Sequence, residues 1–115
     1  MLIQFTQIDY DRDIAFVAIE QPTGDLAGIV RYASTPDRDS AEFGILVRSD
    51  LKRKGLGRML METLIDYAKR QGIGELRGRV LRDNSRMLDL AAKLGFDQVD
   101  GTEQETVQII LPLRG

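Results

Sequence analysis

Apolar residues follow two different spacings along the chain, and the change comes after residue 48. Residues 13–20 and 26–33 are rich in β-branched and aromatic side chains, and each run has the length of a strand. The segment 21–25 between them reads Gln-Pro-Thr-Gly-Asp, which is typical of a turn, so the two runs predict a β-hairpin. A polar loop then leads to residues 41–48, which predict a third strand.

Helical spacing begins at Gly57. The apolar positions over residues 57–71 are Leu60, Met61, Leu64, Ile65 and Ala68. They lie three or four residues apart, which places them on one face of an amphipathic helix. Gly72 follows as a suitable C-terminal stop.

A second unit of strand and helix follows. Residues 75–81 predict a short strand, and Asn84 is a suitable N-cap for a helix that ends at Gly95. The inner face of that helix would consist of Met87, Leu88, Leu90, Ala91 and Leu94. Residues 96–99 and 106–113 predict two late strands. The order β-β-β-α-β-α-β-β predicts an α/β (α+β) protein, with helices on the faces of a mixed, mostly antiparallel sheet.

Composition narrows the chemistry more than the fold. The chain has 115 residues, which suits one domain over residues 1–115, and a net charge of −2, which argues against broad electrostatic binding to nucleic acid. It contains no Cys and no His, so thiolate chemistry, Ser-His-Asp catalysis and the commonest metal ligands are excluded within this chain. A general base must be Asp, Glu, Tyr or a perturbed Lys.

The same residues leave no sign of a metal, a membrane or export. Asp9, Asp11 and Asp13 alternate, but they lack the Gly and the terminal Glu of a calcium loop, so no metal is expected. No apolar stretch reaches the ~20 residues of a membrane span. The N-terminus lacks the layout of a signal peptide. With no Cys either, the sequence predicts a cytoplasmic protein.

Candidate chemistry is concentrated where the spacing changes. Gly55 and Gly57 stand where a strand would pass into a helix, and free amides at a helix start bind phosphate. Lys52, Arg53, Lys54 and Arg58 add positive charge. A dinucleotide loop would need Gly where Leu60 stands, and a nucleotide P-loop is absent. The alternatives are a pyrophosphate-binding loop and a plain strand-to-helix turn with a basic surface.

Two segments resemble motifs of one family. Lys52-Arg53-Lys54-Gly55-Leu56-Gly57, with Val47 in the preceding strand, resembles motif A of the GNAT (general amine N-acetyltransferase) superfamily. The segment from Asn84 to Phe96, with its Lys-Leu-Gly-Phe ending, resembles the second family motif. The resemblance extends from about Ala15 to the C-terminus. It is strongest to the C-terminal domain of bacterial protein lysine acetyltransferases of the Pat type.

The resemblance implies a GNAT fold and binding of acetyl-CoA. Backbone amides of residues 53–58 would hold the pyrophosphate, and the backbone of residues 45–47 would pair with the pantetheine arm. The Val47 amide would also polarise the thioester carbonyl. Asn84 would bond the pantetheine, and Lys93 would lie near the adenosine. The implied cofactor-binding residues are Ile45, Leu46, Val47, Lys52, Arg53, Lys54, Gly55, Leu56, Gly57, Arg58, Asn84, Met87 and Lys93.

Glu42 is the candidate general base, since an amine must lose a proton before it attacks a thioester. A base of this kind acts best when partial burial raises its pKa. Glu42 and Val47 are five residues apart, so their side chains point to opposite faces unless a bulge or kink intervenes. The alternative is a surface or salt-bridged glutamate. The second motif often carries a Tyr as general acid, but Ala91 stands at that position here.

The front of the chain departs from the family pattern. The family begins with a strand and two helices before the hairpin, and here all three are expected to be missing. The chain is then either a C-terminal piece of a longer protein or a reduced natural variant. An exposed sheet edge also leaves room for a homodimer.

The expected reaction is direct transfer of acetyl from acetyl-CoA to a primary amine in a ternary complex, with a protein lysine as first choice of acceptor. The alternatives are a small-molecule amine acetyltransferase and a non-catalytic acyl-CoA-binding regulatory module.

Overall fold

The computed structural model describes residues 2–52, 54–99 and 104–114. In chain order the elements are β1 (Leu2–Asp9), β2 (Asp13–Gln21), β3 (Asp25–Ser34), β4 (Ser40–Val47), the 3-10 turn η1 (Ser49–Leu51), α1 (Leu56–Arg70), β5 (Glu75–Leu81), α2 (Ser85–Lys93), β6 (Asp97–Val99) and β7 (Thr106–Pro112). The described strands form one sheet in the order β1-β2-β3-β4-β5-β7-β6. Its strand pairs are antiparallel except for the parallel pair β4–β5. The predicted mixed, mostly antiparallel sheet is therefore confirmed.

The N-terminal strand is present, and the expectation that it is missing is wrong. Residues Leu2–Asp9 pair with β2 in one uninterrupted antiparallel register, from Leu2 opposite Gln21 to Asp9 opposite Ile14. The segment mixes apolar with uncharged polar residues and is exposed except for Ile3, which suits an edge strand with one hydrogen-bonded neighbour. Residues 10–12 then lead directly into β2, so the described chain has a tight turn between these strands and no helix.

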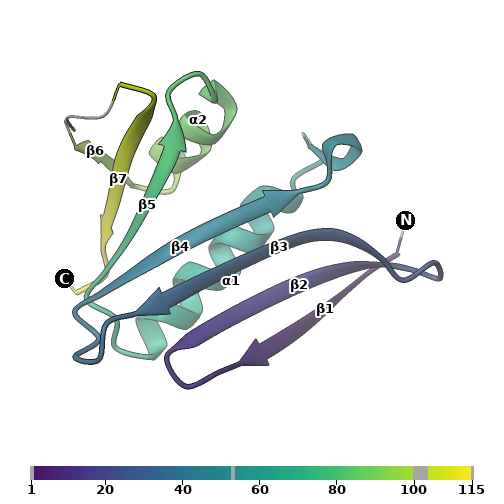
Figure 1. Ribbon diagram of the computed structural model, residues 1–115. Coiled ribbons are helices and arrows are strands. Elements are labelled where there is room, and N and C mark those ends of the chain that lie inside the picture. The colour runs from purple at the N-terminus through teal and green to yellow at the C-terminus, as the bar shows by residue number, and fades with distance from the viewer. Residues whose placement is uncertain (1, 53, 100–103, 115) are drawn as a thin grey trace.

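Both described helices contribute to a single core on one face of the sheet. The buried residues of α1 are Leu56, Leu60, Met61, Leu64, Ile65 and Ala68, which include all five positions predicted from the spacing. They pack on the inward residues of β2, β3 and β4, and Figure 1 shows α1 behind those strands. Ala91 of α2 belongs to the same core. The predicted packing of helices on the sheet is confirmed, and among the described residues no helix covers the other face of β2–β4, because β1 and β2 are joined by a turn.

Within the described ranges, no helix combines the length and the apolar character that crossing a membrane requires.

Candidate functional site

The site lies where two neighbouring strands separate. β4 and β5 are paired only from Ser40–Glu42 to Glu75–Arg77, and beyond that point they diverge (Figure 1). A cavity of about 950 Å³ opens in the resulting gap. It is lined by β4, by the start of α1, by the end of β5 and by α2, so four elements distant in sequence meet there.

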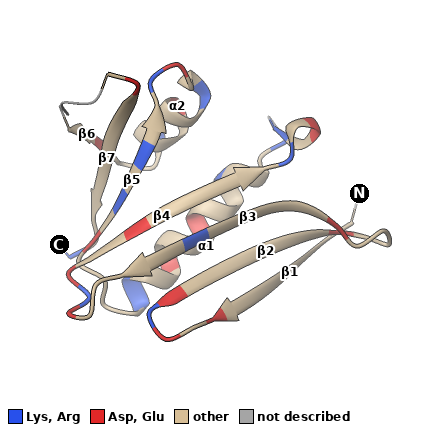
Figure 2. Ribbon diagram, viewed as in Figure 1, with Lys and Arg blue, Asp and Glu red and all other residues tan. Residues whose placement is uncertain are grey.

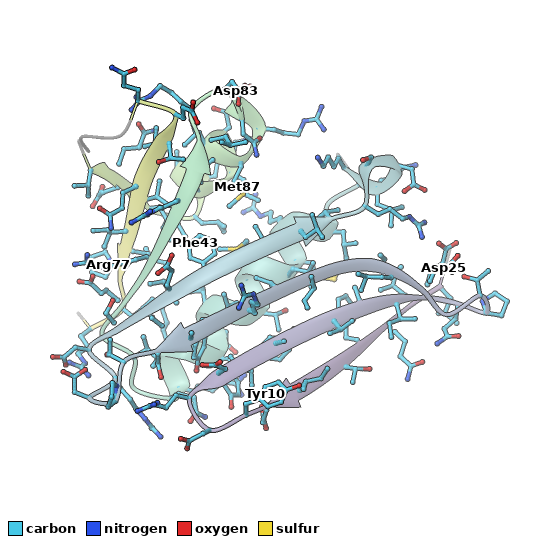
Figure 3. All side chains as sticks on the ribbon, in the orientation of Figure 1. Tyr10, Asp25, Phe43, Arg77, Asp83 and Met87 are labelled. Atoms are coloured by element: carbon cyan, nitrogen blue, oxygen red, sulfur yellow. The ribbon has the colours of Figure 1, made fainter. Side chains whose placement is uncertain are left out.

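An aromatic ring lies against β5 just beyond the paired segment. Phe43 follows the last paired residue of β4, and it lines the cavity although only 8% of its surface is exposed. A Cβ added to Gly78 of β5 would lie 2.4 Å from the Phe43 ring, so the ring rests directly on the glycine backbone. The ring centroids of Phe43 and Phe96 are 5.4 Å apart. Phe43 therefore fills the closed end of the gap, and in Figure 3 it and Met87 lie between β4 and α2.

The backbone of β4 directs unused hydrogen-bonding groups into the gap. The Arg48 N–H donates to the Ala27 carbonyl of β3 at 2.9 Å, so even-numbered residues of β4 face β3. The position of the Leu46 carbonyl oxygen supports this orientation, since the oxygen lies 3.1 Å from a Cβ placed on Gly28 of β3. The N–H and C=O groups of Ile45 and Val47 consequently point towards β5, which is no longer paired there.

Backbone amides without an acceptor in the helix also gather at the start of α1. Gly55 precedes the helix with φ 83°, a left-handed conformation that favours glycine. The first bond of the helix runs from the Met59 N–H to the Gly55 carbonyl at 3.1 Å. The amides of Leu56, Gly57 and Arg58 precede that bond, so none of them has an acceptor within α1. Together with the positive end of the helix dipole they form a site suited to phosphate oxygens.

Gly57 faces the cavity, and its missing side chain leaves room there. A Cβ at this position would lie 3.7 Å from Val47 Cγ2 and 3.9 Å from Leu90 Cδ2, which are ordinary contact distances. The protein core alone would thus accept alanine at residue 57. A larger side chain would extend into the space between β4 and α2.

The far wall of the cavity is the start of α2. The Asn84 side-chain oxygen accepts a hydrogen bond from the Met87 N–H at 3.2 Å, which confirms the predicted N-cap. Asn84 lines the cavity together with Met87, Leu90 and Lys93. One residue thus caps the helix and forms part of the cavity wall.

A charged network braces the segment between β4 and α1. Arg48 Nη2 lies 2.5 Å from Glu20 Oε2 of β2, and Arg48 Nε lies 2.7 Å from Asp50 Oδ1 of the η1 turn. The hydrogen bonds that Arg48 donates to Asp50 and Glu20 raise the pKa of Arg48, and the Arg48 guanidinium lowers the pKa of Asp50. The network ties the start of the loop to the sheet.

Most of the predicted cofactor residues come together at this cavity. Those that line it are Ile45, Leu46, Val47, Lys52, Gly55, Gly57, Arg58, Asn84, Met87 and Lys93. Lys54 is exposed and Leu56 is buried in the core, and neither side chain lines the cavity. Arg53 lies outside the described residues.

Glu42 occupies a different position from these residues. It is exposed, it pairs in register with Arg77, and it does not line the cavity. The β3–β4 register is continuous from Ala41 to Val47, so no bulge against β3 turns Glu42 towards the face of Val47. Glu42 is nevertheless the last paired residue of β4, at the point from which the gap opens.

Sequence reasoning missed the contribution of β5 and one feature of β4. Arg79, Val80 and Leu81 line the cavity, yet no motif marked them. The Ile45 amide has the same orientation as the Val47 amide and lies closer to Glu42 along the strand. No sequence signal marks either feature, because hydrogen-bond direction along a strand depends on register. No cluster of His, Cys, Asp or Glu suited to a metal ion occurs within the described residues.

An elongated ligand that carries phosphates and pairs with a strand backbone would suit this arrangement, and an acyl-CoA is a ligand of that kind. The comparison with known families agrees. The model of the acetyltransferase (GNAT) family matches residues 2–96, and the chain belongs to that family, whose acetyl donor is acetyl-CoA. The match also includes β1, ahead of the residues on which the resemblance rested.

Individual proteins give the same picture. The chain is 36% identical over 98 residues to acetyltransferase PA5475 of Pseudomonas aeruginosa, covering 84% of this chain and 53% of that protein. It is 41% identical over 56 residues to the [ribosomal protein bS18]-alanine N-acetyltransferase of Salmonella typhimurium, covering 49% of this chain and 38% of that protein. The chain thus spans about half the length, or less, of these relatives.

A solved structure shares the fold. The GNAT domain of S. lividans PAT superposes with a TM-score of 0.80 at 24% identity, over 95% of this chain and 65% of that one. The GNAT fold expected from the two motifs is confirmed.

Proposed function

We propose that this chain transfers the acetyl group of acetyl-CoA to a primary amine, with both substrates bound at once. The observation that carries the proposal is the gap between β4 and β5, with free strand amides along one side and free helix amides at its end. A thioester arm would pair with the first set and a pyrophosphate would bind the second.

The cofactor would lie along β4. The amides of Gly57 and Arg58, with the side chain of Lys52, would hold the pyrophosphate. The backbone of Ile45 and Val47 would bind the pantetheine arm as an added strand does. Asn84 would donate its side-chain amide to the arm, next to Met87, and Lys93 would lie towards the adenosine.

The chemical step would be attack of a neutral amine on the thioester carbonyl carbon. A new C–N bond forms and the carbonyl oxygen gains negative charge, which the Val47 amide would stabilise as a hydrogen-bond donor. The C–S bond then breaks and the thiolate of CoA leaves. The amine proton would pass through water to Glu42, since that carboxylate lies outside the cavity. Water would protonate the thiolate, because Ala91 offers no acid.

A protein lysine is the acceptor we propose, and a small-molecule amine is the alternative. A second candidate function is a non-catalytic acyl-CoA-binding module. The exposed position of Glu42 and the presence of Ala91 in place of a Tyr favour that alternative. A cytoplasmic location stays a prediction, and a second copy of the chain is a further proposed partner.

Calorimetric titration with acetyl-CoA tests the binding half of the proposal. We expect micromolar affinity, little change in Gly57→Ala, and at least a hundredfold loss in Gly57→Trp, whose indole would occupy the cavity. A folded chain that binds no acetyl-CoA, or binds it equally well with Trp at residue 57, would contradict this use of the cavity.

Steady-state assays with lysine peptides and small amines test the chemical half. Replacing Glu42 with Gln should lower kcat about a hundredfold, the lower range for loss of a general base, with acetyl-CoA affinity unchanged. Glu62→Gln, which removes an exposed carboxylate paired with Arg58 on α1, is the matched control and should retain kcat. Binding without turnover on any acceptor would favour the non-catalytic module.

A further inference from the structure

The outermost strand of the sheet has one side with no partner in the described chain. β1 is terminal in the sheet order, and Figure 1 shows no described element beyond it. It is eight residues long, and Leu2, Phe5 and Ile8 expose 69%, 43% and 38% of their surfaces. β6, at the opposite edge, has only three residues. β1 is therefore the long open edge of this sheet.

The hydrogen-bond pattern fixes which backbone groups face outward. The Tyr10 N–H donates to the Asp13 carbonyl at 2.8 Å, so residue 10 belongs to a hydrogen-bonded pair of the hairpin. Hydrogen-bonded pairs alternate along an antiparallel ladder, so the even residues of β1 bond to β2. The N–H and C=O groups of Ile3, Phe5 and Gln7 consequently point away from the sheet.

This edge lacks the features that usually prevent an exposed edge strand from pairing with a strand of another molecule. Such edges usually carry a Lys, a Pro or a bulge, or are very short. Residues 2–8 contain no charged residue and no Pro, and the register with β2 has no shift. Asp9 is the charged residue of β1, and in Figure 2 this strand is coloured only near its arrowhead. An uncharged edge of this length would readily accept another strand.

The sequence of β1 is complementary to itself in one antiparallel register. Because outward groups lie on odd residues, an odd residue must face an odd residue, and a two-fold axis at Phe5 meets this condition. The pairs across the axis are then Leu2 with Ile8, Ile3 with Gln7, Gln4 with Thr6 and Phe5 with itself. The outer pair joins two apolar side chains, and the central pair joins two aromatic rings.

Neighbouring registers fit less well. Moving the axis to Thr6 would pair Gln7 with Phe5, Ile8 with Gln4 and Asp9 with Ile3, so every pair off the axis sets a polar against an apolar side chain. In the proposed register only the pair of Ile3 with Gln7 does so. Moving it to Gln4 would place Thr6 opposite Leu2 and would lose the pairing of Phe5 with itself and of Leu2 with Ile8.

We propose that two copies of this chain form a dimer through antiparallel pairing of their β1 strands, with the two-fold axis at Phe5. The axis stands perpendicular to the sheet, so both copies turn the same face to each side. The result is one continuous sheet with both α1 helices on the same side. The cavity beside β4 is remote from the axis, so the dimer does not depend on the proposed acetyltransferase function.

Mass in solution is the first test. Sedimentation or light scattering of the full chain should give twice its 12.9 kDa. Gln7→Pro removes one outward N–H and leaves the bonds to β2, because Gln7 does not bond inward. It should give a monomer, whereas its matched control Gln7→Ala should remain dimeric. Circular dichroism and thermal melting of both variants show whether they are folded, and this check does not depend on the proposed function.

Disulfide trapping tests the register without weakening the strand. The chain has no Cys, so each introduced thiol is the only one present. Phe5→Cys should form a disulfide-linked dimer, because facing Cα atoms of a hydrogen-bonded pair are about 5.5 Å apart, within disulfide range. Gln7→Cys alone should not, since the two thiols would lie about 14 Å apart along the strands. Ile3→Cys combined with Gln7→Cys should link again.

Three results would overturn the proposal. One is a wild-type chain that is monomeric at high micromolar concentration. Another is a dimer that persists in folded Gln7→Pro, which would place the interface elsewhere. The third is faster linkage of Gln7→Cys than of Phe5→Cys, which would indicate a different register.

Discussion

The two ends of β4 share one neighbour and differ in the other. Both ends bond to β3 in an unbroken register from Ala41 to Val47. At the first end, Ser40–Glu42 also pair with β5, and the backbone is bonded on both sides. At the second end, residues 43–47 have no strand on that side, and the cavity lies there instead. One strand thus provides both a rigid anchor and an open binding edge.

The difference shows that one side of the candidate site consists of backbone N–H and C=O groups of β4 that have no partner strand. The gap begins where the Phe43 ring rests on Gly78. Beyond it, donors that would otherwise form a parallel ladder remain free for a ligand. Because the closed end holds β4 and β5 at a fixed divergence, those donors are positioned before any ligand binds, which lowers the ordering cost of binding.

Of the substitutions that test the difference between the two ends of β4, Gly78→Ala should have the largest effect. The new Cβ would lie 2.4 Å from Phe43 Cε1, and the ring is held by Phe96, so the closed end must rearrange. Overpacking of this kind costs about 1–3 kcal/mol of unfolding free energy. Urea unfolding measures it, and acetyl-CoA affinity should fall in parallel. Gly44→Ala is the control, because its nearest neighbour is 4.0 Å away. Equal stability of both variants would show that Phe43 does not fix the gap.

A smaller effect is expected on the far wall, from Asn84. Asn84→Ala removes the side-chain oxygen that accepts the hydrogen bond from the Met87 N–H, and this should lower the free energy of unfolding by about 1 kcal/mol. Asn84→Asp keeps the capping oxygen and removes the side-chain amide donor. We therefore expect Asp to restore the melting temperature and to leave acetyl-CoA binding weakened. Full recovery of binding with Asp would mean that the amide does not contact the cofactor.

The smallest effect should come from the Glu20–Arg48–Asp50 network. Asp50→Asn should raise KM for acetyl-CoA a few-fold with kcat unchanged, since it loosens the loop and leaves β4 in place. Arg48 lowers the pKa of Asp50, so the contribution is full above the ordinary Asp value and is lost as pH falls through the lowered pKa. The difference from wild type should thus be present at neutral pH and vanish in acid. Asp66→Asn, paired with Arg70 on exposed α1, is the control. A changed kcat would contradict a positioning role.

Much of the fold was predictable because side-chain spacing reports burial. The strand predicted over 75–81 has those bounds in the structure, and the helix predicted over 57–71 is Leu56–Arg70. β1 was missed because Gln4, Thr6 and Gln7 dilute its apolar residues, and an edge strand buries little. The turn residues 9–13 after it were the available signal.

The site was only partly predictable, for a different reason. Gly55 and Asn84 carry local conformations, a left-handed residue and a helix cap, that residue type reveals. The divergence of β4 from β5 depends on register between segments more than 30 residues apart, and the direction of the Ile45 and Val47 amides depends on the register of β4 with β3. The spacing of residues within one strand does not determine how that strand pairs with another. The sequence therefore identified the glycine loop before α1 but not the gap between β4 and β5.

The short β4–β5 pairing also bears on how the chain folds and breathes. β1 to β4 are joined by turns between sequence neighbours, whereas β5 must reach Ser40–Glu42 across the whole of α1. Contacts between residues far apart in sequence form late in folding. The antiparallel strands β1 to β4 should therefore form first, and the β5–β7 unit should dock onto them afterwards. The three residue pairs between β4 and β5 are then the seam between two cooperative units, one formed by β1 to β4 and the other by the β5–β7 unit. Amide hydrogens at this seam should exchange at a lower opening energy than those of the β2–β3 ladder, and the cavity would widen each time the seam opens.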